Sequence, residues 1–167
     1  SGYQIAQTQP MKLAAVEGLY EGGTNVGLVG IGMLNPEKKT YNDGKDPFLF
    51  RIEIPSMLSF LAERDVDGYV PGITNIIEGG YQLKDGTTAL SAAEKIERGK
   101  TAIGALAAYR AAKSAGHEED AAVAYQVLQE NMPYFGYGYI KDVNQLVPNV
   151  PLNFYAFRIM VILGGYF

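Results

Sequence analysis

The stretch Gln9-Pro10-Met11-Lys12-Leu13-Ala14-Ala15-Val16-Glu17-Gly18 predicts a short helix around which the rest of the chain is organised. Proline is tolerated in the first helical turn, the residues that follow it are good helix formers, and glycine commonly ends a helix. Lys12 and Glu17 lie about 140° apart round such a helix, so they are not spaced for an intrahelical ion pair. On spacing alone, both are surface charges that face different neighbours.

Composition indicates one folded domain, or at most two. The chain has 167 residues, of which 47% are apolar and 19% charged, and this content is typical of a globular core. A net charge of −4 excludes the basic face that nucleic-acid binding requires. The absence of cysteine excludes disulfides, zinc-thiolate sites and thiol nucleophiles, and the sole histidine, His117, is expected in a solvated turn.

Two apolar runs predict a small antiparallel β-hairpin, Val26–Leu34 with Phe48–Ile54, and the turn-forming residues Asn42-Asp43-Gly44 lie between them. The second run alternates between apolar and charged side chains, as a half-buried strand does. Arg51 and Glu53 are expected on its open face. Four apolar side chains are expected on its buried face: Phe48, Phe50, Ile52 and Ile54.

Helical patterns dominate the remainder. A helix is expected from Pro55 to Glu63, with Arg64 at the end where a cation complements the helix dipole, and a shorter one at 73–79. A long helix is expected from Thr87 or Thr88 to Gly116, and another begins at Glu118 and ends at Pro133. Together the last two predict an antiparallel helical hairpin. The predicted fold class is therefore mainly α with a small antiparallel β-hairpin.

The last run, Phe154 to Phe167, is almost wholly apolar but shorter than the roughly 18–20 residues that span a bilayer. Composition alone favours a terminal element packed on the core over the start of a membrane helix. At the other end, Ser1-Gly2 carries no initiator methionine, basic segment or apolar leader, so we expect a piece of a longer protein.

Four segments in the same order resemble cytochrome bd quinol oxidase subunit I. Residues 9–17 resemble the start of its large periplasmic quinol-binding loop, the Q-loop, and Ile54-Pro55 with 61–67 resembles its Ile-Pro and Arg-x-Val-Asp segment. Residues 135–138 resemble its Gly-Tyr-Gly segment, and 151–161 resemble the segment that enters the following transmembrane helix. The resemblance implies an excised extramembrane loop of a polytopic helical membrane protein: residues 1–153 form the loop domain, and 154–167 start a truncated transmembrane helix.

The resemblance also implies site residues. Lys12 and Glu17 match residues implicated in quinol oxidation, where a partly desolvated carboxylate can act as base and an ammonium can hydrogen-bond the other quinol oxygen. Tyr3 and Arg64 match residues beside the quinol pocket. Two further positions match residues that serve the low-spin haem b: Met160, an axial ligand of the iron, and Arg158, which stabilises the reduced haem or its propionates.

The implied activity is electrogenic oxidation of ubiquinol or menaquinol, with electrons passing to low-spin haem b for reduction of oxygen to water and protons released to the periplasm. High-spin haem b and haem d would lie elsewhere in the subunit, so this piece alone is expected to bind no haem and to be inactive. The expected partners are the quinol, oxidase subunit II, a small accessory subunit and the bacterial inner membrane, with this segment on the periplasmic face.

A second interpretation is a soluble periplasmic helical interaction module without catalytic activity, in which the helical hairpin is the contact surface. An apolar segment that continues in the gene beyond Phe167 would support the oxidase; a stop codon would support the module.

Overall fold

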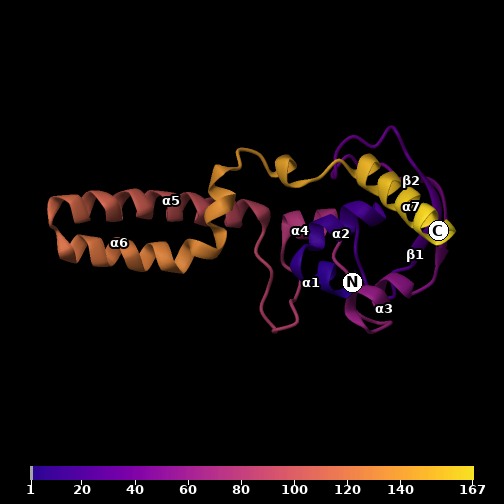
Figure 1. Ribbon diagram of the computed structural model, residues 1–167, viewed down its shortest axis with the longest axis horizontal. Helices are drawn as coiled ribbons and strands as arrows, with labels where there is room; N and C mark the ends of the chain where they lie inside the picture. Colours follow the sequence, from indigo (N-terminus) through magenta and orange to yellow (C-terminus); the bar gives the residue numbers. More distant parts are fainter. Residues whose placement is uncertain (1) are drawn as a thin grey trace. The chain divides into compact units, whose positions relative to one another are not determined.

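The computed structural model describes residues 2–167, and it confirms a mainly helical chain with one two-stranded antiparallel sheet (Figure 1). The chain divides into two compact units. The first unit comprises the chain up to Ala89 together with Leu146–Phe167. The second unit is Leu90–Gln145. Each is described below by itself.

The first unit contains helix α2, Pro10–Glu17, which confirms the predicted helix. Gly18 ends it in the left-handed conformation (φ 61°), and its N–H bonds back to the last turn. The other helices of this unit are α1 (Gly2–Thr8), α3 (Met57–Glu63), α4 (Ile73–Glu78) and α7 (Val150–Tyr166).

Small apolar side chains let these short helices pack closely. Leu58, Ala62 and Val70 form a buried cluster. Partly buried residues from four segments surround it: Ala6, Leu13, Leu19, Val26 and Leu28. As predicted, Arg64 follows the end of α3, where it adopts a left-handed conformation (φ 59°).

The hairpin forms where the sequence predicts it, as β1 (Leu28–Leu34) and β2 (Phe48–Ile54). The predicted burial of β2 is wrong. Of its four alternating apolar side chains only Phe48 is buried, and Phe50, Ile52 and Ile54 are exposed. The reason is a register shift: Met33 pairs with Phe50 but Leu34 pairs with Phe48, so one additional residue in β2 resets the alternation and turns Phe48 inward.

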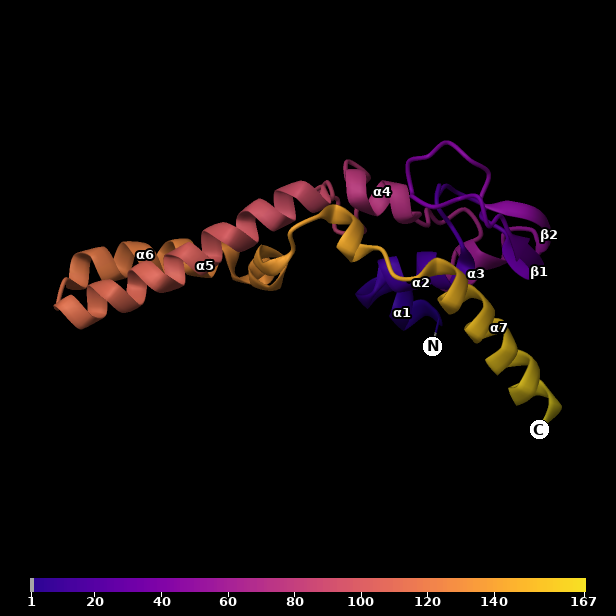
Figure 2. The same ribbon diagram turned by 90° about the horizontal axis from the view of Figure 1, so that it is seen from above.

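The second unit is the predicted antiparallel helical hairpin, formed by α5 (Ala92–Ala115) and α6 (Glu118–Asn131) (Figure 2). Ala102, Ala105 and Leu128 form its buried centre. The 3₁₀ helix η1 (Met132–Tyr139) follows α6 and packs on α5; η2 (Val143–Leu146) comes after it.

One helix boundary differs from the prediction. Helix α5 begins after Ser91, whose hydroxyl accepts a hydrogen bond from the Glu94 N–H (3.2 Å), and not after Thr87 or Thr88. Those threonines belong to a turn, because the Asp85 carboxylate accepts from the Thr87 N–H and Thr88 pairs with Gln82. At the other end, Gly116 (φ 76°) terminates α5 as predicted.

Helix α7 begins at Val150, where the Asn149 side chain accepts a hydrogen bond from the Leu152 N–H (3.0 Å). Among the described residues, the stretch Val143–Tyr166, which includes α7, is the one that is long and apolar enough to cross a membrane. Only 11% of its most apolar window is buried.

Candidate functional site

Glu17 is buried, with 4% of its surface exposed, although its spacing predicts a surface charge. Its carboxylate Oε2 lies 3.2 Å from Nη2 of Arg158 on α7. Two residues that the resemblance assigns to different tasks, proton transfer and haem stabilisation, therefore form one ion pair. Neither composition nor spacing indicates this pair, because its members come from opposite ends of the chain.

Arg158 connects three elements. Its Nη1 donates to the Val16 carbonyl of α2 (2.8 Å) and to the Phe154 carbonyl of α7 (3.2 Å). Its Nη2 donates to the Val29 carbonyl of β1 (2.9 Å) as well as to Glu17. The guanidinium lies 3.5 Å from the ring centroid of Phe154, and its Nε is buried without a partner among the described residues. One cation thus holds α2, β1 and α7 together at Glu17.

Burial raises the pKa of Glu17 above its ordinary value of 4.5, because the charged carboxylate loses its hydration. The charge and hydrogen bond of Arg158 act in the opposite direction and offset part of this rise. The result is a carboxylate that is held in place and that binds a proton more readily than an exposed glutamate.

A cavity of about 210 Å³ borders Glu17, so the carboxylate is not sealed in the core. The ion pair of Arg51 and Glu53 (3.5 Å) from β2 faces the same cavity. The remaining walls come from the end of α2, the segment before β1, the hairpin and α3: Gly18, Leu19, Glu21, Asn25, Val26, Gly27, Val29, Phe48 and Leu58. Glu17 therefore has an adjacent space that water or a substrate group can enter.

Lys12 lies on a different side of α2 and is exposed. Its ammonium makes no ion pair or hydrogen bond with the part of the chain that the structure describes. The structure therefore does not bring Lys12 together with Glu17, in agreement with their angular separation on the helix.

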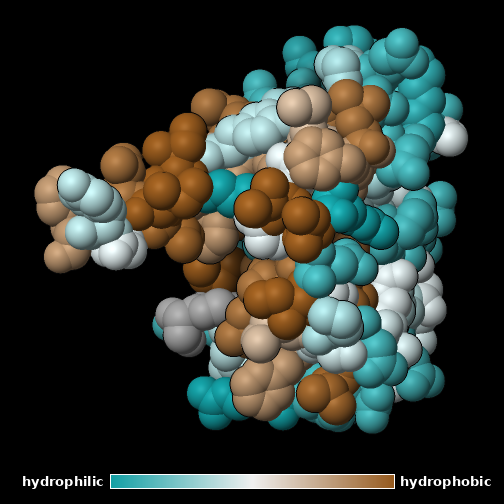
Figure 3. Space-filling view, turned by 90° about the vertical axis from the view of Figure 1, so that its right-hand side faces the viewer, coloured by the Kyte–Doolittle hydropathy of each residue, from teal (hydrophilic) through white to brown (hydrophobic). Residues whose placement is uncertain are grey.

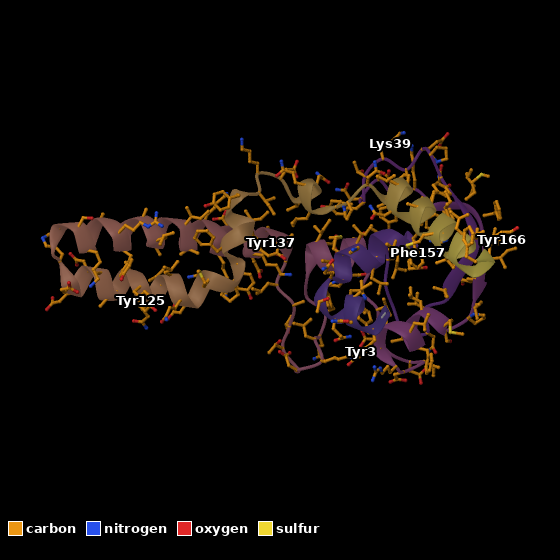
Figure 4. The ribbon with its side chains drawn as sticks, viewed as in Figure 1. Tyr3, Lys39, Tyr125, Tyr137, Phe157 and Tyr166 are labelled. Carbon is orange, nitrogen blue, oxygen red and sulfur yellow. The ribbon has the colours of Figure 1, made fainter. Side chains whose placement is uncertain are left out.

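Tyr3 and Arg64 do come together. The Arg64 guanidinium lies 4.3 Å from the ring centroid of Tyr3, and the Lys84 ammonium lies 4.8 Å from it. Figure 4 labels Tyr3, which belongs to α1. Lys84 also pairs with Glu63 (2.7 Å), whose carboxylate accepts a hydrogen bond from Gln7 (3.1 Å). We call these five residues the Tyr3 cluster. Sequence reasoning missed Lys84, Glu63 and Gln7, because they come from three segments that are remote in sequence: the turn before α5, the end of α3, and α1.

A pocket of about 310 Å³ adjoins the Tyr3 cluster. Its lining combines aromatic, apolar and polar side chains: Ala6, Gln7, Pro10, Glu63, Tyr69, Pro71, Tyr81, Gln82, Leu83, Lys84 and Asp85. Because Gln7, Glu63 and Lys84 belong to both, the cluster forms one wall of this pocket.

Met160 lies two positions after Arg158 on α7 and is 60% exposed. Arg158 points inward to Glu17, whereas Met160 is largely exposed. The resemblance assigns Met160 the role of a haem ligand, which a thioether sulfur can fill. The described residues contain no group of three or more histidine, cysteine or acidic side chains that could hold a metal ion. His117 lies at the start of α6 in the second unit, with its side chain exposed and 3.7 Å from Asp120.

The family model of cytochrome bd terminal oxidase subunit I matches residues 1–167, so the chain belongs to this family. One similar protein is "Cytochrome bd-II ubiquinol oxidase subunit 1" of Escherichia coli (strain K12), which is 29% identical over 179 residues. The match covers 99% of this chain and 31% of the relative. The chain thus spans about a third of the length of the curated relative it matches. Family membership favours the oxidase subunit over the soluble interaction module.

Proposed function

We propose that this chain is the periplasmic quinol-binding loop of subunit I of a cytochrome bd oxidase, with residues 154–167 at the start of a transmembrane helix. Members of the family belong to inner-membrane complexes, and the similar protein of Escherichia coli is named a ubiquinol oxidase. The observation that carries the proposal is the buried Glu17 carboxylate, held by an arginine two positions before Met160 on α7.

Oxidation of a quinol, whether ubiquinol or menaquinol, releases two electrons and two protons, so the site needs a base close to the electron acceptor. Glu17 suits this role because burial raises the pKa of its carboxyl group, so it takes up a proton more readily than an exposed glutamate does. In this proposal the adjacent cavity connects Glu17 to water, and the proton is released on the side proposed to be periplasmic. In this proposal Glu17 takes the proton from a quinol hydroxyl.

Lys12, Tyr3 and Arg64 act in binding. Lys12 is free to donate a hydrogen bond to a quinol oxygen or to offset the negative charge of an ionising hydroxyl. The Tyr3 cluster offers a second polar wall, in which Tyr3 is already oriented by two cations. Lys12 and the Tyr3 cluster flank the start of α2, so both would meet a ligand that approaches this end of the helix.

A low-spin haem b, when bound, accepts the electrons that quinol gives up. Met160 would hold its iron through the thioether sulfur, and such a ligand would favour the reduced iron. Arg158 uses four of its five N–H groups on Glu17 and on backbone carbonyls, and the fifth, Nε–H, is buried among the described residues and not open to a propionate. We infer that Arg158 mainly positions Glu17. In the same position, its positive charge would also stabilise the reduced haem.

Oxygen reduction to water would occur at high-spin haem b and haem d, elsewhere in a complex with subunit II and a small accessory subunit. The isolated segment is proposed to be inactive, because the resemblance assigns it one ligand of one haem, Met160.

The test is Glu17→Gln in the complete oxidase. Glutamine keeps the size of the side chain and a hydrogen-bond acceptor for Arg158 but cannot act as a base. We expect quinol oxidation to fall by about 100-fold or more, the usual contribution of a general base, while the haem absorbance spectrum is unchanged. The matched control is Glu119→Gln on the exposed face of α6. Wild-type turnover in Glu17→Gln would remove Glu17 from the mechanism.

A further inference from the structure

The exposed face of the β-hairpin is apolar, whereas the exposed face of a sheet in a soluble protein is usually polar. Three cross-strand pairs are apolar, and none of their six residues lines the cavity at Glu17: Leu28 with Ile54, Ile31 with Ile52, and Met33 with Phe50. Leu28 is partly buried on α3, and the other five side chains are exposed, Ile52 by 64%. We call these five residues the outer hairpin face: Ile31, Met33, Phe50, Ile52 and Ile54. It contains no charged or hydrogen-bonding side chain.

The charged residues of the hairpin lie on its other face. Arg51 and Glu53 line the cavity beside Glu17, and the nearest neighbours of Gly32 are Val29 and Phe48, which turn to the same side. In an antiparallel sheet with one side in water, the polar residues face the water and the apolar residues face the core. Here five apolar residues are exposed on one face, while Arg51 and Glu53 lie on the other face with 48% and 40% of their side chains exposed. The medium outside the outer hairpin face is therefore expected to be apolar.

Helix α7 indicates which medium this is. The hairpin is fastened to α7 by a hydrogen bond from the Leu34 N–H to the Tyr155 hydroxyl (2.9 Å), by the bond from Arg158 to the Val29 carbonyl, and by the edge-to-face contact of Phe48 with Phe154 (5.5 Å). Ile159 lies four residues after Tyr155, which is about 6 Å along the helix axis at about 1.5 Å per residue. From there the exposed surface is apolar: Ile159, Met160, Val161, Ile162 and Leu163.

Figure 3 shows hydrophobic side chains on the projecting end of the molecule and further apolar groups on the adjacent surface. Figure 2 identifies the projecting end as α7. The hairpin thus lies beside the point at which the candidate membrane span leaves the folded unit.

We propose that the outer hairpin face rests on the outer leaflet of the membrane, at the depth of the lipid head groups and the first methylenes. A lipid surface fits a face that offers apolar side chains and no polar side chain to recognise a specific partner. Each strand of this two-stranded sheet has one free edge, whose backbone N–H and C=O groups need water or head groups, so the hairpin stays at the interface and does not enter the hydrocarbon core. The inference rests on the proposed membrane span in α7.

The test is nitroxide labelling of the complete oxidase in nanodiscs of phosphatidylethanolamine and phosphatidylglycerol, in a background without other reactive cysteines. Ile52→Cys reports on the outer hairpin face, Ile162→Cys on the proposed span, and Lys39→Cys on the exposed loop between the two strands. Oxygen concentrates in lipid, and a polar nickel chelate concentrates in water. We expect the Ile52 label to resemble the Ile162 label, with relaxation by oxygen dominant, and the Lys39 label to show the reverse.

Three outcomes overturn the proposal in different ways. Nickel accessibility at Ile52 equal to that at Lys39 would place the face in water. Low accessibility to both reagents at Ile52 would show that a protein surface covers it. High nickel accessibility at Ile162 would show that α7 does not span the membrane, and the membrane part of the proposed function would fail with it. If the label at Ile162 is in lipid but the label at Ile52 is not, only the inference about the hairpin fails. Quinol oxidase activity of each labelled variant shows that it is folded.

Discussion

At the residue scale, the ion pair of Glu17 and Arg158 decides most of what the site can do. Both groups are largely shielded from water, so each depends on the other to remain charged. We expect Arg158→Met to destabilise the first unit by about 3–5 kcal/mol, because it leaves an unpaired buried carboxylate. The measurement is the midpoint temperature of thermal unfolding of the purified oxidase.

The double variant Glu17→Gln with Arg158→Met is the control for this prediction. It removes both charges, so it is expected to recover part of the stability that Arg158→Met loses. Equal destabilisation by Arg158→Met in the presence and absence of the Glu17 charge would mean that Arg158 acts through its backbone contacts alone.

The raised pKa of Glu17 predicts a pH dependence of stability. Since folding raises this pKa above 4.5, the folded state binds the proton more tightly than the unfolded state does. The contribution of this pKa shift to the free energy of unfolding is therefore complete below pH 4.5, and it is lost as pH rises through the folded-state pKa of Glu17. We expect the midpoint temperature of wild type relative to that of Glu17→Gln to fall over this range. A constant difference between the two proteins would contradict the shift.

The site residues show what sequence comparison alone can predict. Lys12 and Glu17 were both predicted from the resemblance, and their separation on the helix follows from spacing. The burial of Glu17 does not follow, because it is caused by Arg158 and Val29, which are remote in sequence. The contact of Tyr3 with Arg64 likewise depends on the packing of α1 against α3.

At the scale of elements, two glycines of α5 have opposite roles. A Cβ on Gly99 would overlap the backbone of Tyr134 and Gly138 in η1, whereas a Cβ on Gly104 would meet open space. The Gly-Tyr-Gly segment at 136–138 therefore packs directly on the α5 backbone. We expect Gly99→Ala to destabilise the second unit by about 1–3 kcal/mol, the usual cost of overpacking.

Gly104→Ala is the matched control, since it changes the same residue type in the same helix. It is expected to stabilise α5 by about 0.5–1 kcal/mol, because alanine is the better helix former. Hydrogen exchange of the α5 amides in the complete oxidase measures both effects. Equal protection in the two variants would contradict the close packing of α5 on η1.

The elements themselves were predicted well from periodicity and turn chemistry, and the errors have local causes. The hairpin lies at the predicted positions, but register shifts reverse the face of Phe48 relative to Phe50, and alternation in a sequence does not reveal a bulge. The start of α5 was placed too early, because Thr87 and Thr88 carry the same side-chain oxygen as the residue that caps the helix, Ser91.

At the scale of the whole molecule, the second unit is an insertion within the first. The chain leaves the first unit after Ala89 and returns to it at Leu146. The sequence has no polar linker long enough to mark either boundary, so composition does not locate the division into two units. The helical hairpin was nevertheless predicted, since its contacts are local along the chain.

The proposed topology predicts that both units are reachable from the periplasm. Lys39 lies in the exposed loop of the first unit, and Glu119 lies in the exposed first turn of α6 in the second. We expect a membrane-impermeant maleimide to label Lys39→Cys and Glu119→Cys in intact spheroplasts without disruption of the membrane. A cysteine on a cytoplasmic segment of the same oxidase serves as the negative control. Labelling only after lysis would place the loop on the cytoplasmic side, where protons taken by Glu17 could not be released to the periplasm.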